Sequence, residues 1–358
     1  MTTDSMKIFR CLLFFFVAFF PGLLAAPAQP PQSAGPSSSN SIKLDVLVAA
    51  KSGQPAVNLG QQDFTILDNK VPRPITSFKV VTAADEPVEV ILLIDAVNTP
   101  YEMASYMRQG ALKYLRANEG KLTFPTTFAV LTDQGVQVDN GFSTDGIALS
   151  DALEHHQIGL RTINGNAQWG WFDRQQICLN SFQQLLTSVS TLPGRKIILW
   201  VSPGWPLVTG PNIFLTSKQE QKVFSLIVYF STQMREENVT LYNINPIGNQ
   251  QSMTSADYYE DFLKGVTGPN KVRPGSLGVQ VLATQSGGLA IVSDSDVAGN
   301  IQRCVNEAQS WYEIAFDPLP ADKPNEYHHI EIKLDKPGLV ARTRTGYYSN
   351  PVAMNLTR

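Results

Sequence analysis

The sequence is poor in charge, in cysteine and, beyond its first residues, in long apolar runs. Charged side chains make up 16% of the 358 residues, and the formal net charge is −3. No cluster of Lys or Arg is present, which argues against a nucleic-acid-binding surface. After residue 28, no stretch approaches the roughly 18 continuous apolar residues that a transmembrane helix requires, so we expect no membrane span in the mature chain.

Known catalytic motifs are also lacking. The sequence has no Gly-x-Ser-x-Gly elbow, no His-Glu-x-x-His, no phosphate-binding loop and no Gly-x-Gly-x-x-Gly. His155-His156 lies at a predicted helix end and His328-His329 in a predicted strand, where neighbours face opposite ways, so neither pair favours zinc. Ser202 precedes Pro203-Gly204, but no base for a nucleophilic serine is identifiable near it. We therefore expect a protein that is not an enzyme.

Only three cysteines are present, and their spacing matches no metal site. Cys11 lies in the first apolar run. Cys178 and Cys304 each lie on the apolar stripe of a predicted helix, which favours two buried free thiols. Because an exported chain permits disulfide formation, a bond between the two is not excluded by the sequence.

Residues 1–28 predict a secretory signal peptide. Lys7 and Arg10 form a basic start, and the apolar run Cys11–Phe20 is too short to span a bilayer. Ala26-Pro27-Ala28 offers small residues for cleavage after Ala28; an uncleaved anchor is the alternative. We expect a secreted protein, or one kept in a periplasm or cell envelope.

Between residues 85 and 311 the pattern alternates between strands and helices. Expected strands are 88–95, 126–132, 136–142, 196–201, 239–244 and 288–292, and expected helices are 100–116, 144–156, 173–192, 217–237, 275–285 and 294–309. Such repeated units predict an α/β domain with a mostly parallel, Rossmann-like sheet and helices on both faces.

Short strands flank this domain. A Pro/Ser linker at 29–41 leads into an N-terminal β unit at 42–84, with strands expected at 43–49, 63–67 and 76–81. The C-terminal region 312–358 has a strand expected at 312–316 and a hairpin of 327–334 with 339–347. Since neither region buries much alone, we expect the two to pack as one small β subdomain.

The segment around Asp95 is the most informative part of the chain. The apolar run that begins at Val88 predicts a strand buried on both faces and ends at Asp95. Thr99 is a candidate helix N-cap, Pro100 suits the first helical position, and Glu102 completes a capping-box pattern. Asp95 should therefore lie at the carboxyl end of a central strand, where open α/β sheets bind ligands.

The chain resembles a von Willebrand factor A domain, specifically the secreted acidobacterial von Willebrand factor A-related proteins. No single matching segment is specific, but their order and spacing together are. The matching segments are Asp63–Asn69, Leu92–Thr99, Leu192–Ser202, Asn238–Asn245, Leu282–Gly288 and Arg342–Tyr348.

This resemblance implies a metal-ion-dependent adhesion site, but the sequence departs from its motif. Asp95 matches the first ligand and Thr99 the second hydroxyl, while Val97 replaces the first serine and Pro203 the later aspartate. Thr162 is the candidate for the remaining threonine. A small cation that demands six oxygen ligands should bind poorly here, so we expect no cofactor. The alternative is Mg²⁺ held by Asp95, Thr99 and waters.

Aromatic residues in the loops form the candidate binding rim. Trp169 and Trp171 precede the third predicted helix, Trp205 follows a strand, and Tyr258 and Tyr259 lie in a long loop. Exposed Trp and Tyr anchor protein interfaces and stack on sugars, although such residues can also fold inward. We expect a secreted binding or adhesion module whose ligand is a protein or a cell-envelope component. The alternatives are Mg²⁺-dependent adhesion and a hydrolase or carbohydrate-active enzyme in the same cleft.

Overall fold

The computed structural model describes residues 41–50, 58–156, 169–205, 215–246, 258–292 and 294–352. The segment predicted as a signal peptide and Thr162 lie outside these ranges, and so does the predicted linker except for Ser41. Within these ranges, no helix has the length and apolarity needed to cross a membrane.

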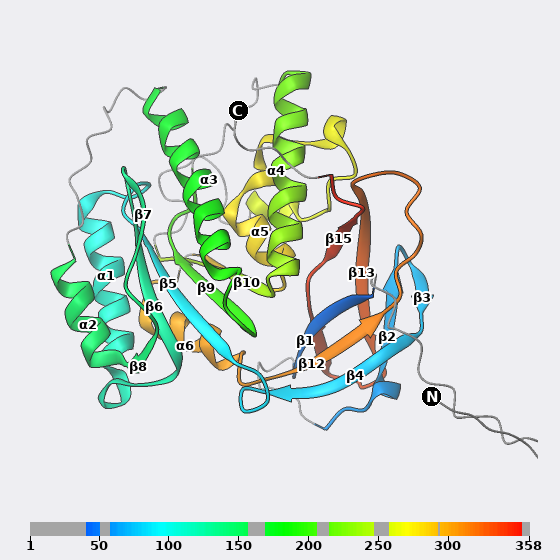
Figure 1. Ribbon diagram of the computed structural model, residues 1–358, viewed down its shortest axis with the longest axis horizontal. Helices are drawn as coiled ribbons and strands as arrows, with labels where there is room; N and C mark the ends of the chain where they lie inside the picture. Colours follow the sequence, from blue (N-terminus) through cyan, green and yellow to red (C-terminus); the bar gives the residue numbers. More distant parts are fainter. Residues whose placement is uncertain are drawn as a thin grey trace, which may run out of the picture. The chain divides into compact units, whose positions relative to one another are not determined.

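A mostly parallel sheet forms the centre of the α/β domain, with strand order β11-β10-β9-β5-β6-β7 (Figure 1). Its parallel strands are β5 (Val88–Asp95), β6 (Lys121–Thr132), β9 (Arg195–Val201), β10 (Val239–Asn245) and β11 (Ala290–Val292). β7 (Gly135–Val138) and β8 (Ser143–Asp145) pair antiparallel with β6. Because β5, β9 and β10 are covered on both faces, their sequences are almost continuously apolar.

Helices cover both faces of this sheet (Figure 1). One face packs against α3 (Trp169–Val189), α4 (Ser217–Glu236) and α5 (Val279–Gln285), and the other against α1 (Tyr101–Arg116), α2 (Gly146–His155) and α6 (Val297–Asn306). Alternate residues of β5 serve the two cores: Leu93 faces α3, and Leu92 faces α1. Short 3₁₀ helices are η1 (Gln61–Asp63), η2 (Ala117–Gly120), η3 (Tyr258–Phe262), η4 (Pro269–Lys271) and η5 (Pro274–Leu277).

The strand order reverses between β5 and β9. The chain leaves β5 through α1 to β6 on one side, whereas β9 lies on the other side of β5. The crevice outside the carboxyl ends of β5 and β9 is therefore the topological switch point, where open α/β sheets bind ligands.

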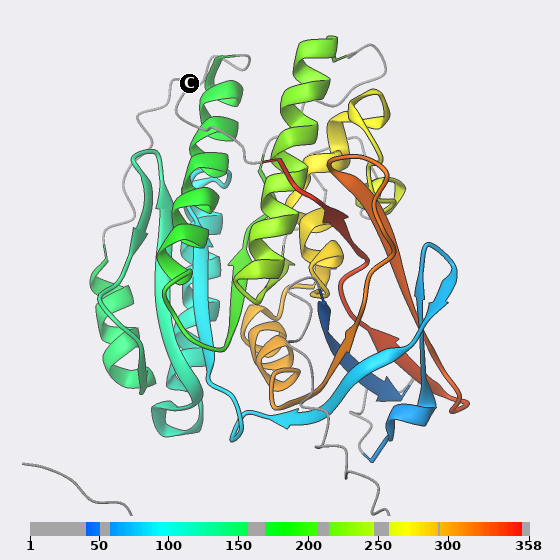
Figure 2. The ribbon, with the colours of Figure 1, turned by 45° about the vertical axis from the view of Figure 1, so that its right-hand side comes forward.

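The β subdomain consists of two antiparallel sheets that face each other (Figure 2). The first has the order β14-β1-β12-β4, from β14 (Leu339–Arg342), β1 (Ile42–Ala50), β12 (Ser310–Phe316) and β4 (Ile75–Thr82). The second has the order β15-β13-β2-β3, from β15 (Gly346–Ser349), β13 (Glu326–Leu334), β2 (Phe64–Asp68) and β3 (Val71–Arg73). Both sheets combine strands from the two ends of the described chain around a shared apolar core. The predicted fold class is confirmed.

The predicted C-terminal hairpin is wrong. β14 pairs with β1 in the first sheet, with Val340 opposite Ala49, and only β15 pairs with β13, with Tyr347 opposite His328. The expected second strand divides after Arg342, because Tyr347 enters the shared apolar core of the two sheets. Burial in two different sheets therefore outweighs the local turn signal.

The chain leaves the β subdomain for the α/β domain and returns to it at neighbouring points. The backbone N–H of Ala83 donates to the carbonyl of Gln309 at 3.1 Å, and Thr82 pairs with Ser310 in the β4–β12 ladder. The chain therefore builds half of each β sheet, then the whole α/β domain, and then the other half.

The two cysteines in the described part of the chain are free and buried. Cys178 belongs to the core under α3, and Cys304 to the core on the opposite face of the sheet. The prediction of two buried free thiols is confirmed, because the sheet separates the two side chains.

Candidate functional site

Asp95 is the last residue of β5, at the topological switch point, and is 0% exposed. Its Oδ1 accepts hydrogen bonds from the backbone N–H groups of Val97 at 3.0 Å and Asn98 at 2.9 Å. Asp side chains favour this local turn, because they bond to their own backbone two residues on. The carboxylate therefore shapes the loop between β5 and α1.

The other carboxylate oxygen joins two neighbouring strands. Asp95 Oδ2 accepts from Asn98 Nδ2 at 2.7 Å and from Ser202 Oγ, directly after β9, at 2.6 Å. Ser202 Oγ in turn accepts from the backbone N–H of Gly204 at 2.9 Å. Since an ionised carboxylate has about four acceptor positions, the chain itself saturates Asp95.

Burial sets the electrostatics of this cluster. It raises the pKa of Asp95, against the opposing effect of the hydrogen bonds from Ser202, Asn98 and Val97. Asn98 Nδ2 also lies 3.1 Å from Sγ of Cys178, whose pKa is raised by burial and by the charge of Asp95. The Cys178 thiol therefore stays protonated and is not an activated nucleophile.

The predicted capping role of Thr99 is wrong. Pro100 occupies the N-cap position of α1 and makes no side-chain capping hydrogen bond. The hydroxyl of Thr99 instead donates to the backbone carbonyl of Asp95 at 2.5 Å, and Thr99 is 1% exposed. The Thr99 hydroxyl, which the capping-box pattern assigned to the start of α1, is thus engaged by the nearer carbonyl of Asp95.

The residues present do not fit a divalent metal ion. Both oxygens of Asp95 and the hydroxyl of Thr99 are engaged within the chain. Val97 is buried and apolar, and Pro203 supplies no side-chain oxygen. In the part of the chain that the structure describes, no group of three or more His, Cys, Asp or Glu side chains could hold a metal ion. Among the described residues, the site offers a small cation no octahedral oxygen set.

Trp205 is not part of an exposed rim. It is 4% exposed, and its indole N–H donates to the carbonyl of Leu277 at 2.8 Å. Its ring meets that of Trp200 edge-on, with centroids 5.2 Å apart. The indole joins the loop after β9 to η5 and closes the core beneath, which corrects the prediction of an exposed anchor.

The other four predicted rim residues lie on two elements. Trp169 and Trp171 are in the first turn of α3 rather than in the loop before it. Tyr258 and Tyr259 begin η3, and Tyr259 is half-buried. The role of these four residues in a binding rim stays a prediction.

Two exposed tyrosines at this edge were not predicted. Tyr101, the first residue of α1, is 57% exposed, and Tyr106 is 45% exposed. Tyr106 Oη donates to the carbonyl of Ser295, just before α6, at 2.6 Å. Neither tyrosine lies on the apolar stripe of α1 that contains Met107. This position off the stripe could have predicted their exposure from the sequence.

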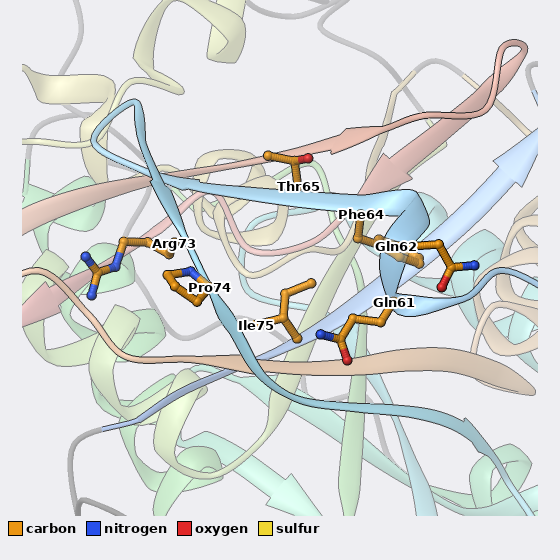
Figure 3. Close-up of a pocket in the computed structure, with 7 residues that line it drawn as sticks. All are labelled: Gln61, Gln62, Phe64, Thr65, Arg73, Pro74 and Ile75. Atoms are coloured by element: carbon orange, nitrogen blue, oxygen red, sulfur yellow. The ribbon is translucent and has the colours of Figure 1, made fainter.

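The pocket in Figure 3 lies in the β subdomain, remote in sequence from Asp95. Its lining comes from η1, from β2 and from the corner between β3 and β4: Gln61, Gln62, Phe64, Thr65, Arg73, Pro74 and Ile75. Arg73 Nε is engaged with the carbonyl of Asp317 at 2.9 Å. Since the pocket gathers no acid–base pair or nucleophile, it is not the candidate site.

Comparisons with known proteins found structures of similar fold, whereas no protein-family model and no curated protein sequence matches the chain. A von Willebrand factor type A protein from Catenulispora acidiphila is 12% identical over 88% of this chain and 76% of its own, with a TM-score of 0.35. A mutant of the PilB minor pilin from Streptococcus sanguinis is 9% identical over 77% of this chain and 80% of its own, with a TM-score of 0.40. The manganese-loaded TRAP protein of Plasmodium vivax is 11% identical over 75% of this chain and 96% of its own, with a TM-score of 0.33.

The strand order of this chain defines its fold: a mostly parallel sheet with β5 and β9 at its centre, an antiparallel edge strand β7 and helices on both faces. This is a von Willebrand factor A-like fold.

Proposed function

We propose that this protein is a secreted, non-enzymatic binding module that engages a protein or cell-envelope ligand through the edge of the sheet at Asp95, without a bridging metal ion. The proposal includes membership of the secreted acidobacterial von Willebrand factor A-related proteins, which the sequence resembles. N-terminal sequencing of the exported protein tests its location: we expect the mature chain to begin at Gln29.

The observation that carries the proposal is the saturation of Asp95. In a metal-dependent adhesion site this carboxylate must offer an oxygen to the cation. Here four donors from the chain occupy it, from two backbone amides and from the side chains of Asn98 and Ser202. Ser202 is 0% exposed and donates to a carboxylate rather than to a histidine, which also disfavours a hydrolase.

The exposed surface at this edge suits a protein ligand. Tyr101 and Tyr106 stand at the start of α1, directly after the loop that Asp95 shapes. Exposed tyrosines supply large contact areas with a polar tip and are enriched among the residues that dominate binding energy. Because the loop beneath is held by buried hydrogen bonds, this surface is preorganised.

Thermal unfolding with and without cations tests the metal-free part of the proposal. The protein is melted after chelation and then with Mg²⁺, Mn²⁺ or Ca²⁺, alongside Asp95→Ala. Binding to the folded state raises apparent stability by mass action. We expect the same Tm in every condition; a rise that Asp95→Ala abolishes would instead establish metal-dependent adhesion.

A binding assay in chelator tests the surface. The labelled protein is incubated with cell-envelope fractions, and the double variant Tyr101→Ser/Tyr106→Ser is compared with Val80→Ser. Val80 is 56% exposed on β4, in the β subdomain, and serves as a matched surface control. We expect retention of the wild type and the control but not of the double variant. Equal retention of all three would exclude this edge as the binding surface.

A further inference from the structure

An unusual cluster of arginines lies where the β subdomain meets the base of the α/β sheet, at the end opposite Asp95. Arg195 begins β9, is 1% exposed and lies with its guanidinium carbon 4.9 Å from the centroid of a Trp311 ring. The distance from Nε of Arg195 to Oδ2 of Asp45 is 3.6 Å, which is within ion-pair range but too long for a hydrogen bond. Nε and Nη1 of Arg195 are buried without a hydrogen-bond partner among the described residues.

Arg344, between β14 and β15, is a second buried cation. It is 8% exposed, and within the described ranges its side chain has no hydrogen bond or ion pair. The β1–β14 ladder ends with Leu47 opposite Arg342, two residues before Arg344. The charges of Asp45, Arg235 and Arg195 all act on Arg344, which places it near these three side chains.

Arg235, in the last turn of α4, completes the cluster. Its Nη2 donates to Glu236 at 3.0 Å, while its Nε is buried and, in the described part of the chain, lacks a hydrogen-bond partner. The pKa of Arg344 is lowered to about 10: burial is the largest cause, Asp45 opposes it, and the charges of Arg235 and Arg195 act in the same direction as burial.

Carboxylates face two of the three cations: Asp45 and Glu86 act on Arg195, and Glu236 is paired with Arg235. Among the described residues, Arg344 has no ion-pair partner. Glu313, opposite Asp45 in the β1–β12 ladder, is engaged with Lys43 at 3.9 Å and Lys79 at 3.8 Å. Asp45 is the one carboxylate within ion-pair distance of Arg195 in the described chain. Buried charges in proteins are normally paired, because an isolated one loses its hydration without compensation.

We propose that a small tetrahedral oxyanion, phosphate or sulfate, binds among Arg195, Arg235 and Arg344. Guanidinium groups present forked N–H donors that match the oxygens of such an anion, and Nε and Nη1 of Arg195 together with Nε of Arg235 supply unused donors. The site is separate from the surface proposed for ligand binding. Its occupant would hold the β subdomain against the α/β domain.

Thermal unfolding of the full chain tests this site. The protein is melted in chloride, inorganic phosphate and sulfate at one ionic strength, together with Arg344→Gln. The control is Arg273→Gln, because Arg273 lies elsewhere, with its guanidinium 4.5 Å from the Phe262 ring centroid. We expect phosphate or sulfate to raise the Tm of the wild type and of the control by about 2 °C or more, and to leave Arg344→Gln unchanged.

Calorimetric titration of the wild type with inorganic phosphate gives a second readout, which does not require any variant to fold. We expect saturable binding with one phosphate per chain. In chloride, Arg344→Gln should melt at or above the wild type, because it removes an uncompensated buried charge. Equal melting of the wild type in all three anions, or an Arg344→Gln loss of stability that is the same in each, would overturn the proposal.

Discussion

Replacement of Asp95 by alanine should destabilise the protein strongly even when no metal ion is present. The substitution leaves the backbone N–H groups of Val97 and Asn98 and the hydroxyl of Ser202 buried without their acceptor. Each buried donor without a partner costs about 1–3 kcal/mol, whereas the half-buried Asn98 amide can turn toward water. We expect the free energy of unfolding to fall by about 3–5 kcal/mol, which is large for one substitution.

Denaturant unfolding in chelator measures this difference, with Asp145→Ala as the matched control. Asp145 is the N-cap of α2, and one carboxylate oxygen accepts from the backbone N–H of Ala148 at 3.0 Å near the surface. Loss of such a cap costs about 1 kcal/mol. If Asp95→Ala were as stable as the wild type in chelator, or more stable, then Asp95 would be a ligand-binding residue held under strain, and our structural account of it would be refuted.

The same carboxyl group gives a pH dependence with a definite sign. Burial raises the pKa of Asp95 above its ordinary value of 3.8, so the folded state holds this proton more tightly than the unfolded chain. Its contribution to stability is therefore fully present below pH 3.8 and is lost as the pH rises through the folded pKa. Since Asp95→Asn cannot titrate, the unfolding free energy of the wild type minus that of Asp95→Asn should fall over this window and then level off. A rise with pH would show that the fold prefers the ionised form.

Three further predictions concern other parts of the fold. Cys178 and Cys304, both buried with raised pKa values, should react with a thiol reagent only after unfolding; rapid reaction of the native protein would contradict their burial. Tyr347→Phe removes the 2.8 Å hydrogen bond to Oδ2 of the buried Asp68, so the free energy of unfolding should fall by about 1–3 kcal/mol in denaturant titrations, and no change would mean that Asp68 finds another donor. Gly288→Ala places a Cβ 1.9 Å from the carbonyl oxygen of Leu241 and should lower the Tm in a thermal melt, unless β10 shifts to admit it.

The fold was accessible from the sequence because its main signals are local. The buried strands β5, β9 and β10 are continuous apolar runs, and the position of Asp95 follows from the end of one of them. The helix boundaries were less accurate at α3, which begins at Trp169 instead of residue 173, and at α5, which begins at Val279 instead of residue 275. At α4 the capping box is formed by Thr216 and Gln219, although Ser217, next to Thr216, also carries a hydroxyl. Neighbouring hydroxyls compete for the same amides, and only the path of the incoming chain selects between them.

The candidate site depends on contacts that sequence patterns do not encode. Ser202 lies 107 residues from Asp95, and their hydrogen bond exists because β9 is placed beside β5. Cys178 reaches Asn98 from a helix over the sheet, across another long separation. A tryptophan in a loop, such as Trp205, can be an exposed anchor, but here its ring is buried edge-on against Trp200. Such outcomes are decided by tertiary packing.

The hydrogen bond between Ala83 and Gln309 has a consequence for how the chain folds. The strands β1 to β4 are synthesised first, yet β1 and β4 find a partner only when β12 follows the entire α/β domain. Closing so long a loop from an unfolded chain carries an entropic cost, and strands that wait unpaired are prone to aggregate. Prior folding of the α/β domain removes most of that cost, because it delivers its two ends side by side. The β subdomain is thus begun first, finished last, and assembled on a template that the middle of the chain provides.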